Sequence, residues 1–302
     1  MAKNNKKRKW IKYLIIILVL LYGASHFIFN NKIDKNKINV RLYIDTSDEV
    51  SKGKLQVNWK YLAAIDAVRY KNDFTKVNSK DLKELANKFI INDKGKYRLK
   101  DIDEVLDKLF FNEKDKKKVY SYLEELKYIG LVSKNLKEGS ANRKFINKLT
   151  PEAINLYKKY KILPSVTIAQ AALESNWGKS KLASKANNLF GIKADKSWTG
   201  KAVTMETKEF YDKVINDKFR AYKDIDKSLQ DYGKFLSENQ RYKKYGVFLS
   251  NHYIEQAQAI EKSGYSTIEN EDGEKIYARL LIHIIKENDL QIIDNKAEIG
   301  YY

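Results

Sequence analysis

The stretch that most constrains the fold lies near the middle of the chain, at residues 164–178, PSVTIAQAALESNWG. Pro164 suits the first turn of a helix, where no intrahelical N–H is needed. The alanine-rich run after it has high helix propensity, and Gly178 is a natural helix stop. The segment therefore predicts one short helix, around which the rest of the chain has to pack.

One face of this predicted helix carries Gln170, Ala171, Glu174 and Trp177, which are spaced three or four residues from Glu174. Apolar neighbours and the negative end of the helix dipole both disfavour a charged carboxylate, so we expect a raised pKa for Glu174. A carboxylic acid that stays protonated near neutral pH is a candidate general acid. A glutamate that simply faces solvent near a helix end fits this helix equally well.

The motifs that follow decide between these alternatives. They are, in order, NNLFGIK (187–193), WTG (198–200), TKEF (207–210), FRAY (219–222), SLQDYGKFL (228–236), RYKKYG (241–246) and SGYST (263–267). Headed by AQAALESNWG, this series resembles the glucosaminidase family of peptidoglycan hydrolases (glycoside hydrolase family 73) over roughly residues 151–290. With its apolar N-terminal segment, the chain is most similar to the membrane-anchored glucosaminidases of Gram-positive cocci.

Cysteine is absent from the 302 residues, which excludes disulfides, a thiolate nucleophile and cysteine metal sites. The three histidines, His26, His252 and His283, are too scattered to indicate a zinc site, and we expect no metal and no cofactor. The net charge of +19 is concentrated in the first half of the chain. Because no nucleic-acid motif accompanies it, this charge favours an anionic membrane surface or wall polymer as partner.

The N-terminus predicts a membrane anchor. A basic head at residues 1–12 precedes an uncharged segment at 13–29, which flanking residues extend to about 20 residues, enough to span a bilayer. Lys and Arg in the head predict a cytoplasmic N-terminus, a single pass, and an extracellular catalytic domain that faces the cell wall. A cleavable signal peptide is the alternative, but Phe27, Ile28 and Phe29 continue the apolar run past the small residues, which favours a retained anchor.

Residues 30–58 are polar, with a short apolar alternation at 40–44, and we interpret them as a stalk containing one strand. Residues 59–148 show four short amphipathic patterns, which predict a small basic helical domain. One of these, at 79–90, has Ser79 as its expected N-cap and a buried stripe of Leu82, Leu85, Ala86 and Phe89. Its role is either to bind a partner or substrate, or to act as a spacer that packs on the catalytic domain.

Residues 149–290 form the predicted catalytic domain, with a first helix at 151–162 capped by Thr150. Alternation at 201–213 predicts a strand segment, and helices resume at about 225–239, 251–262 and 274–288. Residues 291–302 are expected to form a C-terminal tail. The expected fold is therefore mostly helical α+β with a small β-lobe, and the family resemblance implies a lysozyme-like catalytic domain.

Three residues are the candidates for catalysis: Glu174, Glu209 and Tyr265. Glu174 would protonate the leaving oxygen of a glycosidic bond. Glu209 occupies the acidic position of the TKEF motif, which in the family faces the cleft, and it is preferred over Glu206 as the second carboxylate. The resemblance implies a catalytic or substrate-orienting role for Tyr265 in SGYST. Either Glu209 activates water, or the 2-acetamido group of the substrate attacks while Tyr265 orients it.

Amide and aromatic side chains near these motifs are candidates for sugar contact, although aromatic residues also commonly form the core. The predicted substrate-binding residues are Gln170, Trp177, Asn188, Phe190, Gly191, Trp198 and Tyr242. In FRAY, Phe219 and Tyr222 are expected to pack, and Arg220 to pair with a carboxylate.

The resemblance implies an endo-β-N-acetylglucosaminidase that cleaves the β-1,4 bond after N-acetylglucosamine in peptidoglycan glycan strands near the membrane. A lytic transglycosylase of the same fold and a non-catalytic glycan-binding scaffold are the alternatives. Because a tethered hydrolase has to be confined, we also expect a membrane protein partner that contacts the anchor or the 59–148 helices.

Overall fold

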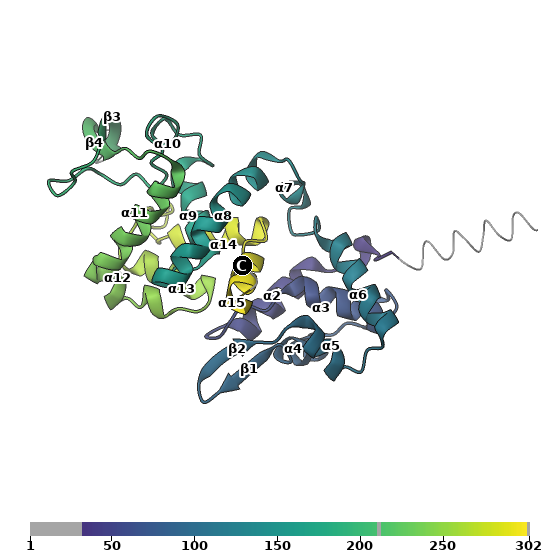
Figure 1. Cartoon of the computed structure of the whole chain (residues 1–302). Coiled ribbons are helices and arrows are strands. Elements are labelled where there is room, and N and C mark those ends of the chain that lie inside the picture. The colour runs from purple at the N-terminus through teal and green to yellow at the C-terminus, as the bar shows by residue number, and fades with distance from the viewer. Residues whose placement is uncertain (1–31, 210–212, 301–302) are drawn as a thin grey trace, which may run out of the picture.

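The structure is a computed structural model that describes residues 32–209 and 213–300, without the side chains of residues 207–215. Figure 1 shows two lobes, with the first at the lower right and the second at the upper left. We call residues 32–140 the first lobe and residues 141–300 the second lobe. Each lobe has its own buried core.

Helices dominate the first lobe, which also contains one antiparallel hairpin. Its elements are α2 (Val40–Ser51), α3 (Trp59–Arg69), α4 (Ser79–Asn87), β1 (Ile90–Asp93), β2 (Lys96–Leu99), α5 (Ile102–Lys108), α6 (Glu113–Leu126) and α7 (Ser133–Leu136), with short 3₁₀ turns at Lys35–Lys37 and Phe74–Lys76. The four predicted helices of residues 59–148 are confirmed as α3, α4, α5 and α6. The hairpin between α4 and α5 was not predicted.

The prediction of a stalk with one strand at residues 30–58 is wrong. Residues 40–51 form helix α2, whose Tyr43, Ile44 and Val50 are buried in the core of the first lobe. The apolar residues at 40–44 were interpreted as a strand pattern, but they belong to the buried face of a helix that continues for two more turns. Of the predicted buried stripe, Leu82, Leu85 and Ala86 are buried in α4, and Phe89 is buried just after the helix ends. The N-cap is Asn78, one residue before Ser79.

The second lobe contains most of the helices and the longer hairpin. Its elements are α8 (Ala141–Tyr160), α9 (Pro164–Ser175), α10 (Lys181–Ala186), β3 (Ala202–Glu209), β4 (Lys213–Arg220), α11 (Ile225–Glu238), α12 (Gln240–Lys244), a 3₁₀ turn at Val247–Leu249, α13 (Tyr253–Lys262), α14 (Tyr277–Glu287) and α15 (Gln291–Ile299). The helix at 164–178, the strand segment and the three later helices are confirmed. The fold is mostly helical α+β, as predicted.

Helix α8 crosses the predicted domain boundary at residues 148–149 without a break. It begins after its N-cap Ser140 and contains Pro151 in its interior, so Thr150 is not an N-cap. The Thr150 hydroxyl instead donates a hydrogen bond to the Ile146 carbonyl at 2.8 Å. Proline at this position lacks the N–H that would bind the carbonyl four residues earlier. Tertiary packing of Leu149, Ala153 and Ile154 in the core compensates for this loss.

Residues 291–299 form helix α15, so the prediction of a C-terminal tail is wrong. Figure 1 shows α15, in yellow, between the two lobes. Ile292 and Ile299 pack against the core of the first lobe, whereas Leu290 and Ile293 belong to the core of the second. Because one face of α15 packs on the first core and another on the second, α15 joins the two lobes.

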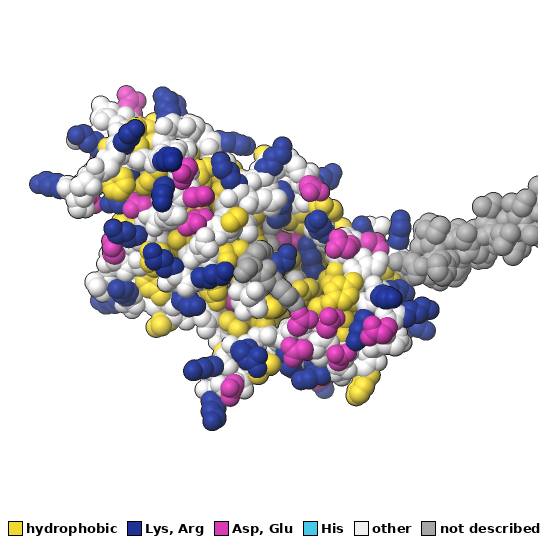
Figure 2. Space-filling view, in the orientation of Figure 1, with side chains coloured by type: hydrophobic (Ala, Val, Ile, Leu, Met, Phe, Trp, Pro, Cys, Tyr) yellow, Lys and Arg dark blue, Asp and Glu magenta, His cyan; other side chains and the backbone are white. Residues whose placement is uncertain are grey.

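Basic side chains are spread over both lobes in Figure 2. The predicted membrane anchor at 13–29 and the basic head at 1–12 lie outside the described residues. Within the described part of the chain, no helix combines the length and apolar character needed to cross a membrane.

Candidate active site

Helix α9 presents Glu174 in its last turn. Pro164 occupies the first turn, and the chain leaves the helix through Asn176 and Trp177, both with positive φ (50° and 58°). Most of α9 is buried, but Glu174 is exposed. The protein around the carboxyl group raises the pKa of Glu174 by desolvation, and a hydrogen bond from Tyr277 lowers it. The net shift is upward, in the predicted direction.

Tyr277 contacts Glu174 directly, and the sequence analysis did not identify it. Its hydroxyl donates a hydrogen bond to Glu174 Oε1 at 2.6 Å and accepts one from Gln170 Nε2 at 3.0 Å. The Gln170 oxygen accepts a further hydrogen bond from the Tyr232 hydroxyl. Gln170 is fully buried. It therefore positions Tyr277 and is not placed to contact a substrate as predicted.

Tyr265 lies beside this network. The Tyr265 ring stacks on the Tyr277 ring with a centroid distance of 5.5 Å. The Tyr242 ring also packs on the Tyr265 ring, with a centroid distance of 6.3 Å. Burial raises the pKa of Tyr265, and the nearby Glu174 charge raises it further. Gly264, with φ of 76°, makes the turn that places Tyr265 there. Glu174 and Tyr265, which are 91 positions apart in the sequence, are thus brought together.

Three predicted sugar contacts are core residues instead. Asn188 is 1% exposed, and its amide donates to the carbonyls of Ile192 and Arg220 while its oxygen accepts from two backbone N–H groups of its own loop. Phe190 is buried and stacks on Tyr232 at 4.0 Å. Tyr242 is fully buried, and its hydroxyl accepts a hydrogen bond from Arg241. As placed, these three buried side chains offer no surface to a glycan.

The other three predicted contacts keep some access to solvent. Gly191 is exposed with φ of 65° and has open space where a side chain would stand. Trp177 is half-buried and packs edge-to-face on Phe145 at 5.8 Å. Trp198 is half-buried, and its indole N–H donates to the Lys201 carbonyl at 2.9 Å. Trp177 therefore braces the end of α9 against α8.

The β3–β4 hairpin carries both candidates for the second carboxylate. Val203 and Met205 are half-buried, whereas Thr204 and Glu206 are exposed, which confirms a two-sided strand. Glu206 pairs in register with Asn216, and Glu209 ends β3 opposite Lys213. The Glu209 side chain lies outside the part of the structure that is described.

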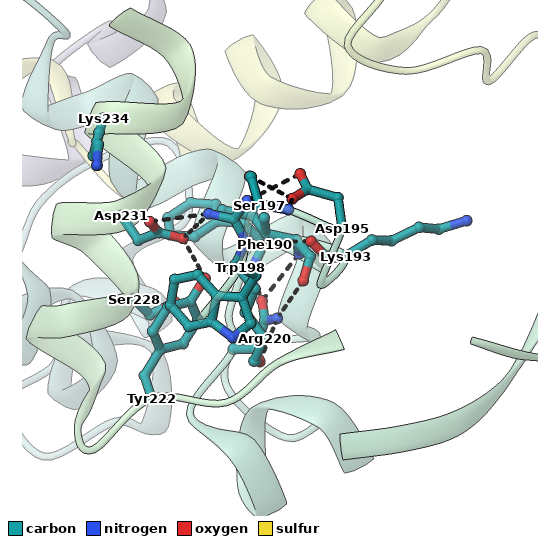
Figure 3. Close-up of polar contacts among 12 residues, drawn as sticks. Phe190, Lys193, Asp195, Ser197, Trp198, Arg220, Tyr222, Ser228, Asp231 and Lys234 are labelled. Atoms are coloured by element: carbon teal, nitrogen blue, oxygen red, sulfur yellow. Dashed lines mark hydrogen bonds and ion pairs between the residues drawn. The ribbon is translucent and has the colours of Figure 1, made fainter. Parts of the chain in front are cut away.

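A cluster around Arg220 fixes this hairpin to the helical part of the lobe (Figure 3). The Arg220 guanidinium donates to both carboxylate oxygens of Asp231 on α11, at 3.1 and 2.9 Å, and to Asp195 at 3.3 Å. Its Cζ lies 4.6 Å from the centre of the Trp198 ring. The Tyr222 hydroxyl donates to Asp231 at 2.6 Å. The expected pairing of Arg220 with a carboxylate is confirmed.

These contacts make Glu174 a candidate proton donor. It combines solvent access, a raised pKa and a fixed orientation imposed by Tyr277, which are the requirements for proton donation to a leaving oxygen. In the described ranges, 32–209 and 213–300, no group of three or more acidic, His or Cys side chains is arranged to hold a metal ion.

Comparison with known proteins assigns a family to part of the chain. Residues 150–290 match the Glucosaminidase family, described as mannosyl-glycoprotein endo-beta-N-acetylglucosaminidase. Residues 150–290 are therefore a glucosaminidase-family domain, that is, a glycoside hydrolase domain. This range starts inside α8 and ends just before α15.

Two curated relatives and one solved structure illustrate the match. The exo-glucosaminidase LytG of Bacillus subtilis is 40% identical over 169 residues, which cover 54% of this chain and 57% of LytG. The peptidoglycan hydrolase FlgJ of Vibrio parahaemolyticus is 41% identical over 104 residues, which cover 32% of this chain and 34% of FlgJ. The crystal structure of the catalytic domain of the autolysin Auto from Listeria monocytogenes aligns with a TM-score of 0.46 and 31% identity, over 61% of this chain and 98% of that domain. The chain thus spans from about a third to just over half of the length of these curated relatives.

Proposed function

We propose that this protein is a peptidoglycan hydrolase that cleaves the β-1,4 bond after N-acetylglucosamine in cell-wall glycan strands. The observation that carries the proposal is the exposed Glu174 carboxyl group, which is held by Tyr277 and has a raised pKa, within a glucosaminidase-family domain. The relatives named peptidoglycan hydrolase and exo-glucosaminidase support the substrate class and the sugar.

In the proposed reaction Glu174 donates its proton to the glycosidic oxygen as the bond to the anomeric carbon breaks. Two routes then complete hydrolysis. Glu209 can activate a water molecule, with inversion. Alternatively the 2-acetamido oxygen, oriented by Tyr265, attacks the anomeric carbon to form an oxazoline, and water, deprotonated by the Glu174 carboxylate, then opens this ring with net retention. Glu206→Gln serves as the control for Glu209→Gln. If Glu209 acts, only Glu209→Gln slows turnover, by about 10²-fold or more.

We further propose that residues 13–29 anchor the protein in the cell membrane, with the N-terminus in the cytoplasm and both lobes facing the wall. The uncharged 17-residue run and its basic flank support this topology. The anchor would restrict cleavage to strands near the membrane, and a membrane protein partner that contacts the anchor or the first lobe would confine it further.

Digestion of purified peptidoglycan by the full chain tests the activity. New reducing N-acetylglucosamine ends, identified by mass spectrometry, are expected for the parent and absent for Glu174→Gln. Glu238→Gln is the matched control, because Glu238 is exposed and also ends a helix, α11. Anhydro-N-acetylmuramic acid ends would instead indicate a lytic transglycosylase, and unaltered cleavage by Glu174→Gln would contradict the proposal.

The length of the released fragments separates internal cleavage from terminal cleavage. An endo enzyme shortens long strands from the first minutes and releases mixed oligosaccharides. An exo enzyme, as LytG is named, releases small products while the strands remain long. We propose internal cleavage, and size-exclusion profiles at early times check it.

A further inference from the structure

A groove of about 940 Å³ lies between the two lobes. Its walls come from α3 and α6 of the first lobe and from α8 and α15 of the second. This volume falls in the range of small-ligand sites, which occur preferentially at domain interfaces. Glu174, Tyr265 and Tyr277 do not line it, so the groove is separate from the candidate active site.

Basic side chains dominate the charge of the groove. Three of them are engaged with the protein: Lys60 forms an ion pair with Asp289 at 2.8 Å, Arg143 donates to the Asn288 carbonyl at 3.0 Å, and the Lys127 ammonium lies 5.4 Å from the centre of the Tyr128 ring. Lys117 on α6 and Lys296 on α15 also line the groove and are exposed. Among the described residues neither forms an ion pair. These two lysines, one from each lobe, are available to bind an anionic group.

The groove also offers acidic, amide and aromatic groups. Glu124 and Glu138 are exposed on its walls, and Asn147 adds an exposed amide. Tyr61 and Tyr128 contribute aromatic surface. A phosphodiester polymer would need cations alone, whereas a short peptide with one amine and one carboxylate would use both charges, the amide and the apolar surface. The lining therefore favours a short zwitterionic peptide.

Helix α8 connects the groove to the active site. Arg143, Asn147 and Thr150 face the groove, while Phe145 packs on Trp177, three residues beyond Glu174. A helix with its side chains is about 10–12 Å across. An extended peptide of four residues reaches about 13 Å. A peptide has to pass around this helix, over roughly 17 Å, so the groove would take the stem peptide of a sugar other than the one at Glu174.

We propose that the groove between the lobes binds the stem peptide of peptidoglycan, with Lys117 and Lys296 on its terminal carboxylate and Glu124 and Glu138 on its side-chain amine. This inference rests on the proposed function for the choice of peptide. It gives the first lobe a role in substrate binding, since α6 supplies Lys117 and Glu124.

Binding of a synthetic stem tetrapeptide to the full chain in detergent tests the proposal. The peptide carries a fluorophore at its N-terminus, where the sugar would be attached, and binding is followed by fluorescence anisotropy. We expect saturable binding that weakens about tenfold or more in Lys117→Glu. The matched control is Lys114→Glu, which changes an exposed lysine of the same helix that does not line the groove. An equal loss in both variants, or no saturable binding by the parent, would overturn the proposal.

Two further ligands sharpen the result. Acetylation of the peptide amine should weaken binding, because Glu124 and Glu138 lose their partner. A glycerol-phosphate polymer should compete poorly. Strong competition by this polymer, together with no effect of acetylation, would show a general anion site and refute the peptide assignment.

Cleavage assays separate this proposal from the proposed activity. Lys117→Glu should digest strands stripped of their peptides as fast as the parent, but digest peptide-bearing strands more slowly. Peptide binding is measured without turnover, so it stands or fails independently of whether the chain cuts glycan. Equal rates for the parent and Lys117→Glu on peptide-bearing strands would count against a role of the groove in substrate binding.

Discussion

Tyr277 opposes the upward shift of the Glu174 pKa. Its hydroxyl donates to the carboxylate at 2.6 Å, and this hydrogen bond lowers the pKa of Glu174 against the larger effect of desolvation. Tyr277→Phe should therefore raise the pKa of Glu174. If Glu174 is the general acid, the high-pH limb of the rate profile should move upward by about one pH unit. Turnover should also fall about tenfold, because the carboxyl group loses its fixed orientation.

Tyr265→Phe is the control for this prediction. Tyr265 stacks on Tyr277 but makes no hydrogen bond to Glu174 among the described contacts. It should slow turnover without moving the high-pH limb. Measurement of kcat against pH for both variants decides the matter. If the high-pH limb of Tyr277→Phe stays in place or moves to lower pH, the Tyr277 hydroxyl does not lower the pKa of Glu174.

Sequence reasoning located Glu174 because the alanine-rich helix and the ordered motifs both point to it. It wrongly predicted that Asn188, Phe190 and Tyr242 contact a sugar. The residue type alone does not show whether an amide or aromatic side chain binds a sugar or is buried in the core. Phe190 is covered by Tyr232 of α11, and Tyr242 of α12 packs on Phe235 of α11, contacts that no local window of sequence contains. Tyr277 was missed because it lies outside every quoted motif.

The start of helix α9 is stabilised by a residue from another element. Leu163, the N-cap, provides no side-chain hydrogen bond. Asp294 of α15 instead accepts from the Ser165 N–H at 2.8 Å and from its hydroxyl at 2.5 Å. Asp294 is 1% exposed, and burial raises its pKa to about 7. An element beyond the family domain thus caps the helix that carries Glu174.

This raised pKa predicts how stability depends on pH. The folded protein keeps the Asp294 proton up to about pH 7, whereas the unfolded chain releases it near its ordinary value of 3.8. The protonated carboxyl group therefore contributes stability that is fully present below about pH 4 and is lost as the pH rises toward 7. The Tm of the parent should therefore fall between pH 4.5 and 7.5, and this fall should be smaller in Asp294→Asn.

Asp226→Asn is the matched control, since Asp226 is an exposed acid in the first turn of α11. Calorimetric Tm values across this pH range should show the parent slope in Asp226→Asn and a shallower slope in Asp294→Asn. Identical slopes in the parent and Asp294→Asn would mean that Asp294 does not carry the proton. Glu298, a second acid of α15 whose pKa burial also raises, should preserve part of the slope.

At the level of elements, the sequence predicted helices with clear amphipathic faces and failed where tertiary contacts override local signals. Pro151 indicates a helix start, yet α8 passes through it because its flanking apolar residues are buried. The tail prediction at 291–302 failed for a related reason. α15 is short and polar on several sides, and its helical structure depends on two cores that no local window contains.

The two lobes are joined by buried polar contacts as well as by α15. Asp48 of α2 accepts from Tyr253 at 2.6 Å and pairs with Lys286 at 3.0 Å. Gln56 donates its backbone N–H to Glu298 at 2.8 Å and accepts at its carbonyl from Asn295 at 2.7 Å. Because these contacts cross the interface, separation of the lobes would break them and leave Asp48, among the described residues, with only the Gln56 amide as a hydrogen-bond donor at 3.3 Å. We therefore expect the lobes to unfold together.

Asp289 provides the sharpest test of this expectation. It lies at the junction of α14 and α15, and its carboxylate reaches into the first lobe, where it accepts from the Trp59 indole at 3.3 Å and pairs with Lys60 at 2.8 Å. Both side chains of the pair are nearly inaccessible to solvent. Asp289→Asn leaves the Lys60 ammonium buried without a counter-charge, which should cost about 3 kcal/mol of unfolding free energy.

Urea unfolding followed by two probes measures this loss of stability and shows whether it affects one lobe or both. Trp59 fluorescence, isolated in a protein whose other tryptophans are replaced by Phe, reports on the first lobe, and far-UV circular dichroism reports on all helices. Both midpoints should fall together in Asp289→Asn, because the pair holds both lobes. Glu49→Gln, which breaks the exposed Lys83–Glu49 pair, should change stability by less than about 1 kcal/mol. If only the Trp59 transition moved, the lobes would be independent, and a stem peptide held between them could not couple the first lobe to cleavage in the second.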